Sequence, residues 1–228
     1  MPALAATVLL VAVVIAIGYL VHARGGVGGS PGGGTLAPGA LRATANTGHV
    51  TGLAPTDCRQ RTAASGQPLP DPGCTPGVVS AAVTQNDLGS TICRPGYTRT
   101  VRAPESETEP FKKKIMTAYH EPGPLADFEL DHLVSLELGG SNDAGNLWPE
   151  RNDHPAGAIN SKDLVENALN KAVCSHTVTL AAAQAAIATD WTTALATLGL
   201  PALHRPRITA GRAGCGREAA GAELRVLP

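Results

Sequence analysis

The stretch 129-ELDHLVSLELGGSNDAGNLWPE-150, followed by 160-NSKDLVEN-167, decides the fold that the sequence predicts. Residues 130–138 alternate between apolar and polar types, which predicts a β-strand. The Gly-Gly-Ser-Asn-Asp run at 139–143 is typical of a turn. Residues 146–148 then predict a short returning strand that ends at Pro149, because proline has no N–H to donate to a ladder.

Helices are expected on the C-terminal side of this strand pair. After a polar loop that reaches residue 159, the apolar residues of 161–174 recur at i, i+3 and i+4, as in a half-buried helix. A second helix is expected from Thr179, a suitable N-cap, to Gly199, a suitable stop. On the N-terminal side, residues 97–102 predict a short strand and residues 108–119 predict a helix. The fold class expected is therefore α+β.

The chain begins with an uncharged apolar run at residues 3–21, ALAATVLLVAVVIAIGYLV. About 20 apolar residues suffice to cross a bilayer as a helix. Segment 1–24 is therefore expected to be a transmembrane anchor or a signal peptide cut after Ala23. The length of the run and the lack of a preceding Lys or Arg favour the anchor. Arg24 would by itself keep the downstream part in the cytoplasm, whereas the cysteines favour export.

Three further regions follow from composition. Residues 25–56 are rich in Gly and Pro, which predicts a flexible tether. Residues 57–200 are expected to form one domain, whose first part is a cysteine-containing loop. Residues 201–228 carry arginines but little apolar content, which predicts a flexible tail.

Five cysteines are present, and none forms a C-x-x-C pair, so a zinc knuckle is not expected. In an exported chain, four of them would form two disulfides. Cys215, in the sparse tail, is the one expected to remain single, and spacing alone does not give the pairing. The alternative is a cytosolic protein with buried free thiols. The five residues are Cys58, Cys74, Cys93, Cys174 and Cys215.

Net charge gives no support for nucleic-acid binding. The formal charge is −1 and the isoelectric point is about 6.6, so the chain lacks the basic balance typical of such proteins. A nucleic-acid function must therefore rest on a particular site.

Such a site is indicated by Asp131-His132, Asn146 and Asn160 within the two quoted stretches. Here the sequence resembles the HNH endonuclease superfamily. Over residues 71–191 it is similar to a group of exported actinobacterial-type proteins with an HNH-like core, through the motifs DPGCTPG, STIC, N-x-KD-x-x-EN and AVC…LAAAQAAIATDW. The resemblance implies a ββα-metal core with flanking helices.

The resemblance also implies roles for these residues. His132 would be the general base, since imidazole titrates near neutral pH. Asp131 and Asn160 would hold one divalent cation, Mg²⁺ by their oxygen atoms, with Mn²⁺ or Zn²⁺ as alternatives. Asn146 would brace the loop and so orient the base. Because neighbours on a regular strand point to opposite faces, Asp131 and His132 are expected at an irregular strand end or bulge.

The last metal ligand is the position at which the sequence departs from the pattern. Asn146 follows Asp131 by 15 residues, as the pattern requires. The pattern then places the ligand eight or nine residues beyond Asn146, where His154 lies in a Pro-Gly loop. We prefer Asn160 at the start of the helix, although Asn there is also a favoured N-cap.

The function expected is a metal-dependent endonuclease that hydrolyses nucleic acid outside the cytoplasm, with DNA preferred over RNA. The membrane would be a second partner through the N-terminal helix, and no small-molecule cofactor is expected. The alternative is a catalytically inactive, disulfide-stabilised binding module tethered to the envelope. The near-neutral charge favours this alternative, because non-specific nucleic-acid binding is mostly electrostatic.

Overall fold

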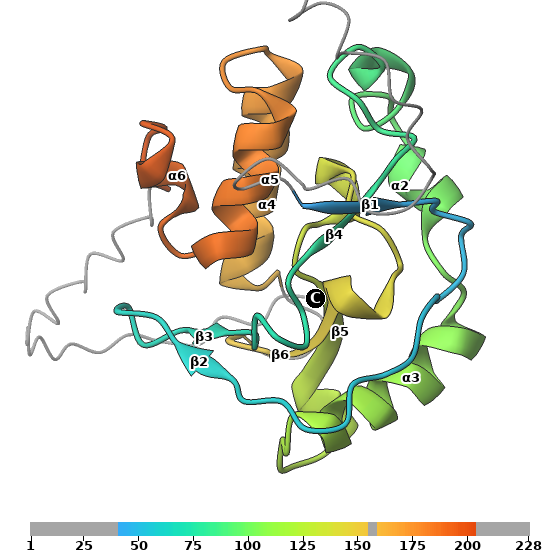
Figure 1. The fold of residues 1–228 in the computed structure, drawn as a ribbon. Helices are drawn as coiled ribbons and strands as arrows, with labels where there is room; N and C mark the ends of the chain where they lie inside the picture. Colours follow the sequence, from blue (N-terminus) through green and yellow to red (C-terminus); the bar gives the residue numbers. More distant parts are fainter. Residues whose placement is uncertain (1–40, 155–158, 204–228) are drawn as a thin grey trace, which may run out of the picture. The chain divides into compact units, whose positions relative to one another are not determined.

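The computed structural model describes residues 41–154 and 159–203 (Figure 1). The chain divides into the units Met1–Pro38 and Gly39–Pro228, and every described residue belongs to the second. The expected anchor or signal segment, the first part of the tether and the tail from residue 204 lie outside the described residues. Within those residues, no helix is long and apolar enough to span a membrane.

In the described part of the chain, the strands form three sheets of two strands each. They are β1 (Arg42–Thr44) parallel to β4 (Val78–Ser80), β2 (Arg61–Thr62) antiparallel to β3 (Pro68–Leu69), and β5 (Phe128–His132) antiparallel to β6 (Leu147–Arg151). The largest of these sheets is the β5–β6 pair, which contains most of the stretch that decides the fold.

Five α-helices accompany the sheets in the described residues, so the fold is α+β as predicted. They are α2 (Tyr97–Val101), α3 (Glu105–Ala118), α4 (Ser161–Cys174), α5 (Leu180–Asp190) and α6 (Ala194–Thr197). Single 3₁₀ turns lie at η1 (Leu88–Ser90), η2 (Leu125–Asp127), η3 (Leu136–Leu138) and η4 (Ala144–Asn146). Between β5 and β6 the chain therefore runs through η3 and η4.

The helix predicted over 161–174 is confirmed at both ends. Thr179 is the N-cap of the next helix, because its side chain accepts a hydrogen bond from the Ala182 N–H. The prediction of one helix as far as Gly199 is wrong. The Asp190 carboxylate accepts hydrogen bonds from both the N–H and the hydroxyl of Thr192, which supports a turn where α5 ends.

The strand predictions need three corrections. Residues 97–101 form helix α2, since a six-residue alternation is too short to distinguish a strand from one helical turn. The strand expected over 130–138 ends at His132. The returning strand continues through Pro149 to Arg151. Proline is tolerated there because β6 has only one neighbouring strand, so the missing N–H need not break a ladder.

The tether expected over 25–56 is folded from residue 41 onward. Residues 41–51, here called the N-terminal strap, include β1 and end at Thr51, whose backbone bonds Asn142 and Ala144. Arg42 forms an ion pair of 2.7 Å with Asp143. Hydrogen bonds from the strap to distant segments offset the entropy lost when this part of the expected tether becomes ordered.

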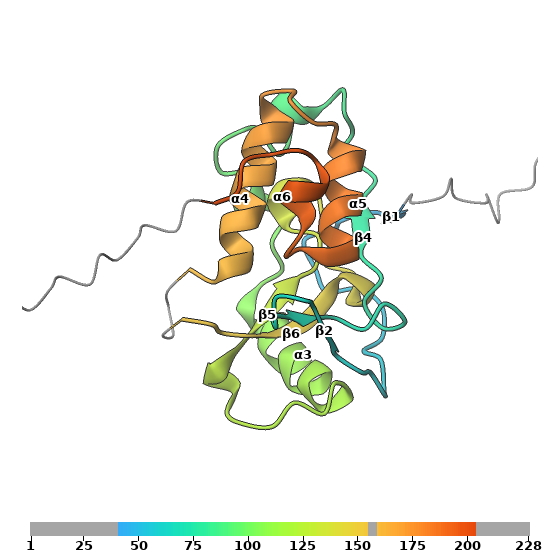
Figure 2. The same cartoon turned by 90° about the vertical axis from the view of Figure 1, so that its left-hand side faces the viewer.

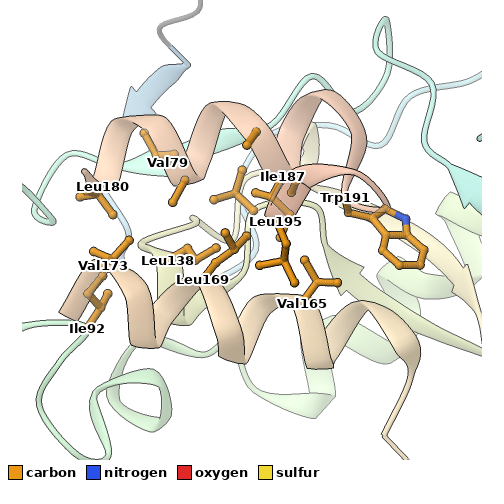
Figure 3. Packing of buried hydrophobic residues seen from close by; sticks show 14 of the residues in the cluster. Val79, Ile92, Leu138, Val165, Leu169, Val173, Leu180, Ile187, Trp191 and Leu195 are labelled. Atoms are coloured by element: carbon orange, nitrogen blue, oxygen red, sulfur yellow. The ribbon is translucent and has the colours of Figure 1, made fainter. Parts of the chain in front are cut away.

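Two hydrophobic clusters form the core. The larger lies between α4 and α5, where Leu138, Leu169 and Ile187 point toward one another (Figure 3). The smaller surrounds α3 and includes Phe111 and Ile115. In Figure 2, α4, α5 and α6 group together, and α3 lies with β5 and β6, against which it packs.

Each cluster is associated with a disulfide, and the prediction of two disulfides from four cysteines is confirmed. Cys58 pairs with Cys74 across 16 residues, and Cys58 is buried in the smaller cluster. Cys93 pairs with Cys174 across 81 residues and joins the end of α4 to the loop before α2. Cys215 lies outside the described residues.

Candidate cation site and buried histidine

The register of β5 and β6 sorts their side chains onto two faces. Directly opposite residues of an antiparallel pair project to the same side, and successive residues alternate. The pairs Glu129–Glu150 and Asp131–Trp148 therefore share one face. The pairs Leu130–Pro149 and His132–Leu147 share the other. We call these the acidic face and the histidine face.

The irregular strand end expected at Asp131 and His132 is absent, and this prediction is wrong. The ladder is unbroken through His132, which pairs with Leu147 and is the last residue of β5. The chain departs from the strand only afterwards. The two side chains consequently enter different environments, although their Cα atoms are about 3.8 Å apart.

On the acidic face, Asp131 is held by two donors at one carboxylate oxygen. The Trp148 Nε1–H donates to Asp131 Oδ2 over 2.8 Å, and Lys162 Nζ lies 2.7 Å from the same atom. Lys162 comes from the first turn of α4 and is fully buried. Its ammonium also donates to the backbone oxygen of His132 at 2.9 Å and to the Glu166 carboxylate. All three N–H groups of the ammonium therefore have acceptors.

Carboxyl groups outnumber the ammonium group in this cluster. Burial is the main cause that raises the pKa of Glu166, and it outweighs the opposing attraction of Lys162. Burial, followed by the charge of Asp131, raises the pKa of Glu150 and of Glu129. One lysine thus faces four acidic side chains, and the cluster is short of positive charge.

Three of these carboxyl groups are arranged so that they could hold a cation. Oxygen atoms of Glu129, Asp131 and Glu150 lie within 4.8 Å of one another. Glu150 is only 3% exposed, and its Oε2 has no hydrogen-bond partner among the described residues. Carboxylate oxygens are the ligands that Mg²⁺ and Ca²⁺ prefer. The donor set and the unpaired oxygen therefore fit a hard divalent cation.

On the histidine face, His132 is buried with 8% of its surface exposed. Its Nε2 lies 2.9 Å from Asn142 Oδ1. Burial lowers the pKa of His132 to about 4, although the hydrogen bond with Asn142 and the charge of Asp131 oppose this shift. The ring is therefore neutral at physiological pH, as a general base must be before it accepts a proton.

Asn146 lies at the end of η4 and is fully buried. Its Oδ1 accepts hydrogen bonds from the Val134 N–H at 3.0 Å and the Val78 N–H at 3.3 Å. Its Nδ2 donates to the backbone oxygens of Val134 and Ser141, each at 2.9 Å. The amide thus ties together the loop after β5. None of these four bonds goes to the His132 ring.

Asn160 is the N-cap residue of α4, and its N–H donates to Asp163 Oδ2 at 2.8 Å. Its side-chain oxygen accepts from the Asp153 N–H at 3.2 Å, and its Nδ2 donates to Asn152 Oδ1 at 3.3 Å. The Asn160 side chain also opposes the rise in the pKa of Glu129, so it lies close to that carboxyl group. Asn160 therefore adjoins the acidic face while it holds the loop before α4. His154, the alternative ligand, places its Nε2 3.6 Å from Asp153 Oδ1 and is not part of the carboxylate trio.

A hollow of about 260 Å³ adjoins the cluster. Its lining includes Glu166, together with Asp163 and Glu137. The exposed Arg102 lines it as well and contributes to the lowered pKa of His132, which places its charge near the ring. Ser135 also lines the hollow, and its buried Oγ has no hydrogen-bond partner in the described segments, so this hydroxyl is free to bind a ligand.

Comparison with known protein families, with curated proteins and with solved structures found no match. The site's chemistry therefore has to be judged from its own residues.

Sequence reasoning missed several residues of the site. Glu129 could have been found, because it precedes Asp131 by two residues and so shares its strand face. Lys162 and Glu166 stand four residues apart on one helix, which permits an ion pair, but nothing local indicates that the pair is buried. Glu150 and Asn142 required the register of β6 and the path of the loop, neither of which has a sequence signal.

Proposed function

We propose that this chain is a divalent-cation-dependent phosphodiesterase of the HNH type that cleaves nucleic acid. The observation that carries the proposal is the buried carboxylate trio, with its unpaired Glu150 oxygen, one residue away from a neutral buried histidine. In this proposal β5, β6 and α4 are the ββα-metal core. The two disulfides are compatible with a site of action outside the cytoplasm.

Because Asp131 and His132 project to opposite faces of the strand pair, the proposal requires one phosphodiester to reach both through the hollow, which borders Glu166 of the carboxyl cluster and Arg102 near the His132 ring. Asp131, Glu129 and Glu150, with Asn160 beside them, would hold the cation. When bound, a divalent cation stabilises negative charge on the phosphate and the leaving oxygen. His132 accepts a proton from the attacking water. Asn146 keeps the loop after β5 in place, and Lys162 fixes the orientation of Asp131 through a 2.7 Å contact.

The hollow beside the cluster is the proposed entrance for the phosphodiester. Arg102 supplies one positive charge there, Glu137 and Asp163 are acidic neighbours, and burial keeps Glu166 largely protonated near neutral pH. Ionised carboxylates in this lining would repel a phosphate group, so binding should require an added cation. This charge balance supports cation dependence independently of the trio's geometry.

The rival function is a non-catalytic envelope module that binds a protein or wall polymer. It is favoured by the burial of His132 and by the complete pairing of the Lys162 ammonium. Buried, fully hydrogen-bonded polar groups of this kind can also serve only to orient α4 on the strand pair, without any catalytic role. The two functions differ in whether the His132 ring is needed after the protein has folded.

Plasmid nicking by the full-length chain in detergent tests the proposal, with Mg²⁺ or Mn²⁺ and with chelator. We expect chelator-sensitive nicking that His132→Ala lowers by roughly 10²-fold or more, the usual contribution of a general base. The control is His176→Ala, which removes an exposed histidine after α4. Cleavage of single-stranded RNA in parallel distinguishes the two substrates. Absence of chelator-sensitive nicking by the folded wild type would favour the binding module, and equal nicking by folded His132→Ala would exclude His132 as the base.

A further inference from the structure

The His132 ring is held by a side-chain amide that no sequence motif indicates. His132 Nε2 and Asn142 Oδ1 lie 2.9 Å apart. Asn142 is 2% exposed, so water does not replace its protein partners. The nitrogen of its amide lies 2.7 Å from the backbone oxygen of Val101 and 2.9 Å from Asn46 Oδ1. Asn142 thus connects the histidine to α2 and to the N-terminal strap.

Chemistry fixes the direction of these hydrogen bonds. A backbone carbonyl can only accept, so the Asn142 atom that faces Val101 must be the NH₂ group. The amide oxygen therefore faces the ring, and an amide oxygen can only accept. Nε2 of the neutral His132 must consequently carry the hydrogen, which leaves the lone pair on Nδ1.

The far end of the chain of bonds is fixed in the same way. The Gly48 backbone N–H donates to Asn46 Oδ1 over 3.1 Å, and an N–H cannot accept. Asn46 therefore presents oxygen to Asn142, in agreement with the direction set by Val101. Two backbone groups, one donor and one acceptor, determine the polarity of both amides. Reversing either amide would place two donors or two acceptors face to face.

The strap that carries Asn46 is itself anchored on both sides of this residue. Before it, Arg42 pairs with Asp143 at 2.7 Å. After it, the Val50 N–H donates to Glu107 Oε2 at 3.0 Å, and Thr51 forms backbone bonds on either side of Asp143. The strap therefore holds Asn46 against the same loop that contains Asn142.

We infer that Asn142 and Asn46 are positioning residues that hold His132 with its hydrogen on Nε2 and its lone pair on Nδ1. No hydrogen bond engages Nδ1 within residues 41–154 and 159–203. In the proposed nuclease, which this role presupposes, Nδ1 is then the atom that accepts the proton from water. The orienting residue is Asn142, which contacts the ring, whereas Asn146 acts on the backbone of the loop.

The test is a long-range ¹H–¹⁵N correlation of the histidine rings in the full-length, ¹⁵N-labelled chain in detergent at pH 8. This spectrum distinguishes a ring nitrogen that carries hydrogen from one that does not. We expect His132 to carry its hydrogen on Nε2 in the wild type. Asn142→Asp keeps an acceptor facing Nε2 and should keep this tautomer, but its second oxygen faces the Val101 carbonyl and Asn46 Oδ1, so the melting temperature should fall. Asn142→Leu removes the acceptor and should give a mixture with hydrogen on Nδ1.

Asn46→Ala should shift the tautomer less than Asn142→Leu does, because Val101 still orients Asn142. Asn86→Ala, at an exposed asparagine, is the matched control and should leave the spectrum unchanged. A wild-type ring with its hydrogen on Nδ1, or an unchanged tautomer in a folded Asn142→Leu protein, would overturn the inference. Should Asn142→Leu fail to fold, loss of the Nε2–H tautomer in Asn142→Asp would overturn it equally.

Nicking assays on the same variants distinguish this inference from the proposed function. Asn142→Leu should lower the turnover rate by roughly 10- to 100-fold, the usual effect of removing a group that orients a functional residue, with little change in KM. Asn142→Asp, which keeps the acceptor for Nε2, should retain more of the activity than Asn142→Leu does. If the tautomer behaves as expected while no variant nicks nucleic acid, the orientation of His132 stands and the nuclease proposal fails.

Discussion

The two faces of the β5–β6 pair differ more than their shared backbone suggests. The acidic face carries Glu129, Asp131 and Glu150, which meet one buried lysine from α4. The histidine face carries His132, which meets a neutral chain of amides. Adjacent residues of one strand thus face a carboxyl-rich cluster on one side and an uncharged hydrogen-bond network on the other. The difference shows that an Asp-His dipeptide on a regular strand contributes to two environments.

The largest effect is expected from Lys162→Met, which removes the one buried cation that residues 41–154 and 159–203 place on the acidic face and keeps most of the stem volume. Removing one partner of a buried ion pair costs about 3–5 kcal/mol, because uncompensated charge remains. Lys171→Met, at an exposed position in the last turn of α4, is the control. Thermal unfolding of both variants measures the difference, and equal melting temperatures would show that the ammonium is not the counter-charge.

The Lys162→Met protein should recover part of its lost stability at acidic pH. Burial raises the pKa of Glu150 and Glu166, so these groups stabilise the fold when protonated. Their contribution is present below the unfolded value near 4.5 and is lost as the pH rises through the folded value. Lys162→Met should therefore lie closer to wild type at pH 5 than at pH 8. The opposite trend would contradict a shortage of positive charge.

The histidine face should respond to pH in the opposite direction. Because the pKa of His132 falls from 6.5 to about 4, the unfolded chain takes up the proton first. The contribution of His132 to the free energy of unfolding is complete above pH 6.5 and is lost as the pH falls toward 4. The total loss is roughly 3 kcal/mol. His132→Gln should flatten the loss of melting temperature across this range, and His176→Asn should not. Identical slopes for all three proteins would refute the assignment.

Cation binding can be measured on the acidic face without any nuclease assay. Tb³⁺ bound at the carboxylate trio should emit after tryptophan excitation, because Trp148 Nε1 lies 2.8 Å from Asp131 Oδ2. Glu150→Gln should weaken Tb³⁺ binding by about tenfold or more, as expected for the loss of a charged ligand, and Mn²⁺ should compete with Tb³⁺. Glu109→Gln, an exposed site on α3, is the control. Unchanged emission in Glu150→Gln would exclude this residue as a ligand.

The smallest effect concerns the solvent-exposed end of the histidine face. The Arg151 guanidinium carbon lies 4.4 Å from the centre of the Phe128 ring. A cation–π contact at an exposed site contributes about 0.5–1 kcal/mol. Arg151→Gln should therefore lower stability by about this amount in urea unfolding, with no change in Tb³⁺ binding. A loss of stability comparable to that of Lys162→Met would mean that the exposed Arg151 charge contributes as much to folding as the buried Lys162 charge.

The sequence by itself determined the features that depend on near neighbours. The helix at 161–174 follows from a 3.6-residue period, and the cap at Thr179 from one hydroxyl and a nearby N–H. The Lys162–Glu166 pair follows from spacing along a helix. The α+β class and the presence of two disulfides could be predicted as well. In each case the interacting groups lie within a few residues, or composition alone was sufficient.

Only the tertiary structure decided the site itself. Glu129 meets Glu150 because of a strand register that spans 21 residues, and Asn46 reaches Asn142 across 96 residues. The burial of Lys162, the pairing of cysteines 81 residues apart and the regular ladder at Asp131 and His132 arise in the same way. Such contacts form when the free energy gained by packing exceeds the entropy cost of closing long loops. A local pattern of residue types does not indicate which distant segments will meet.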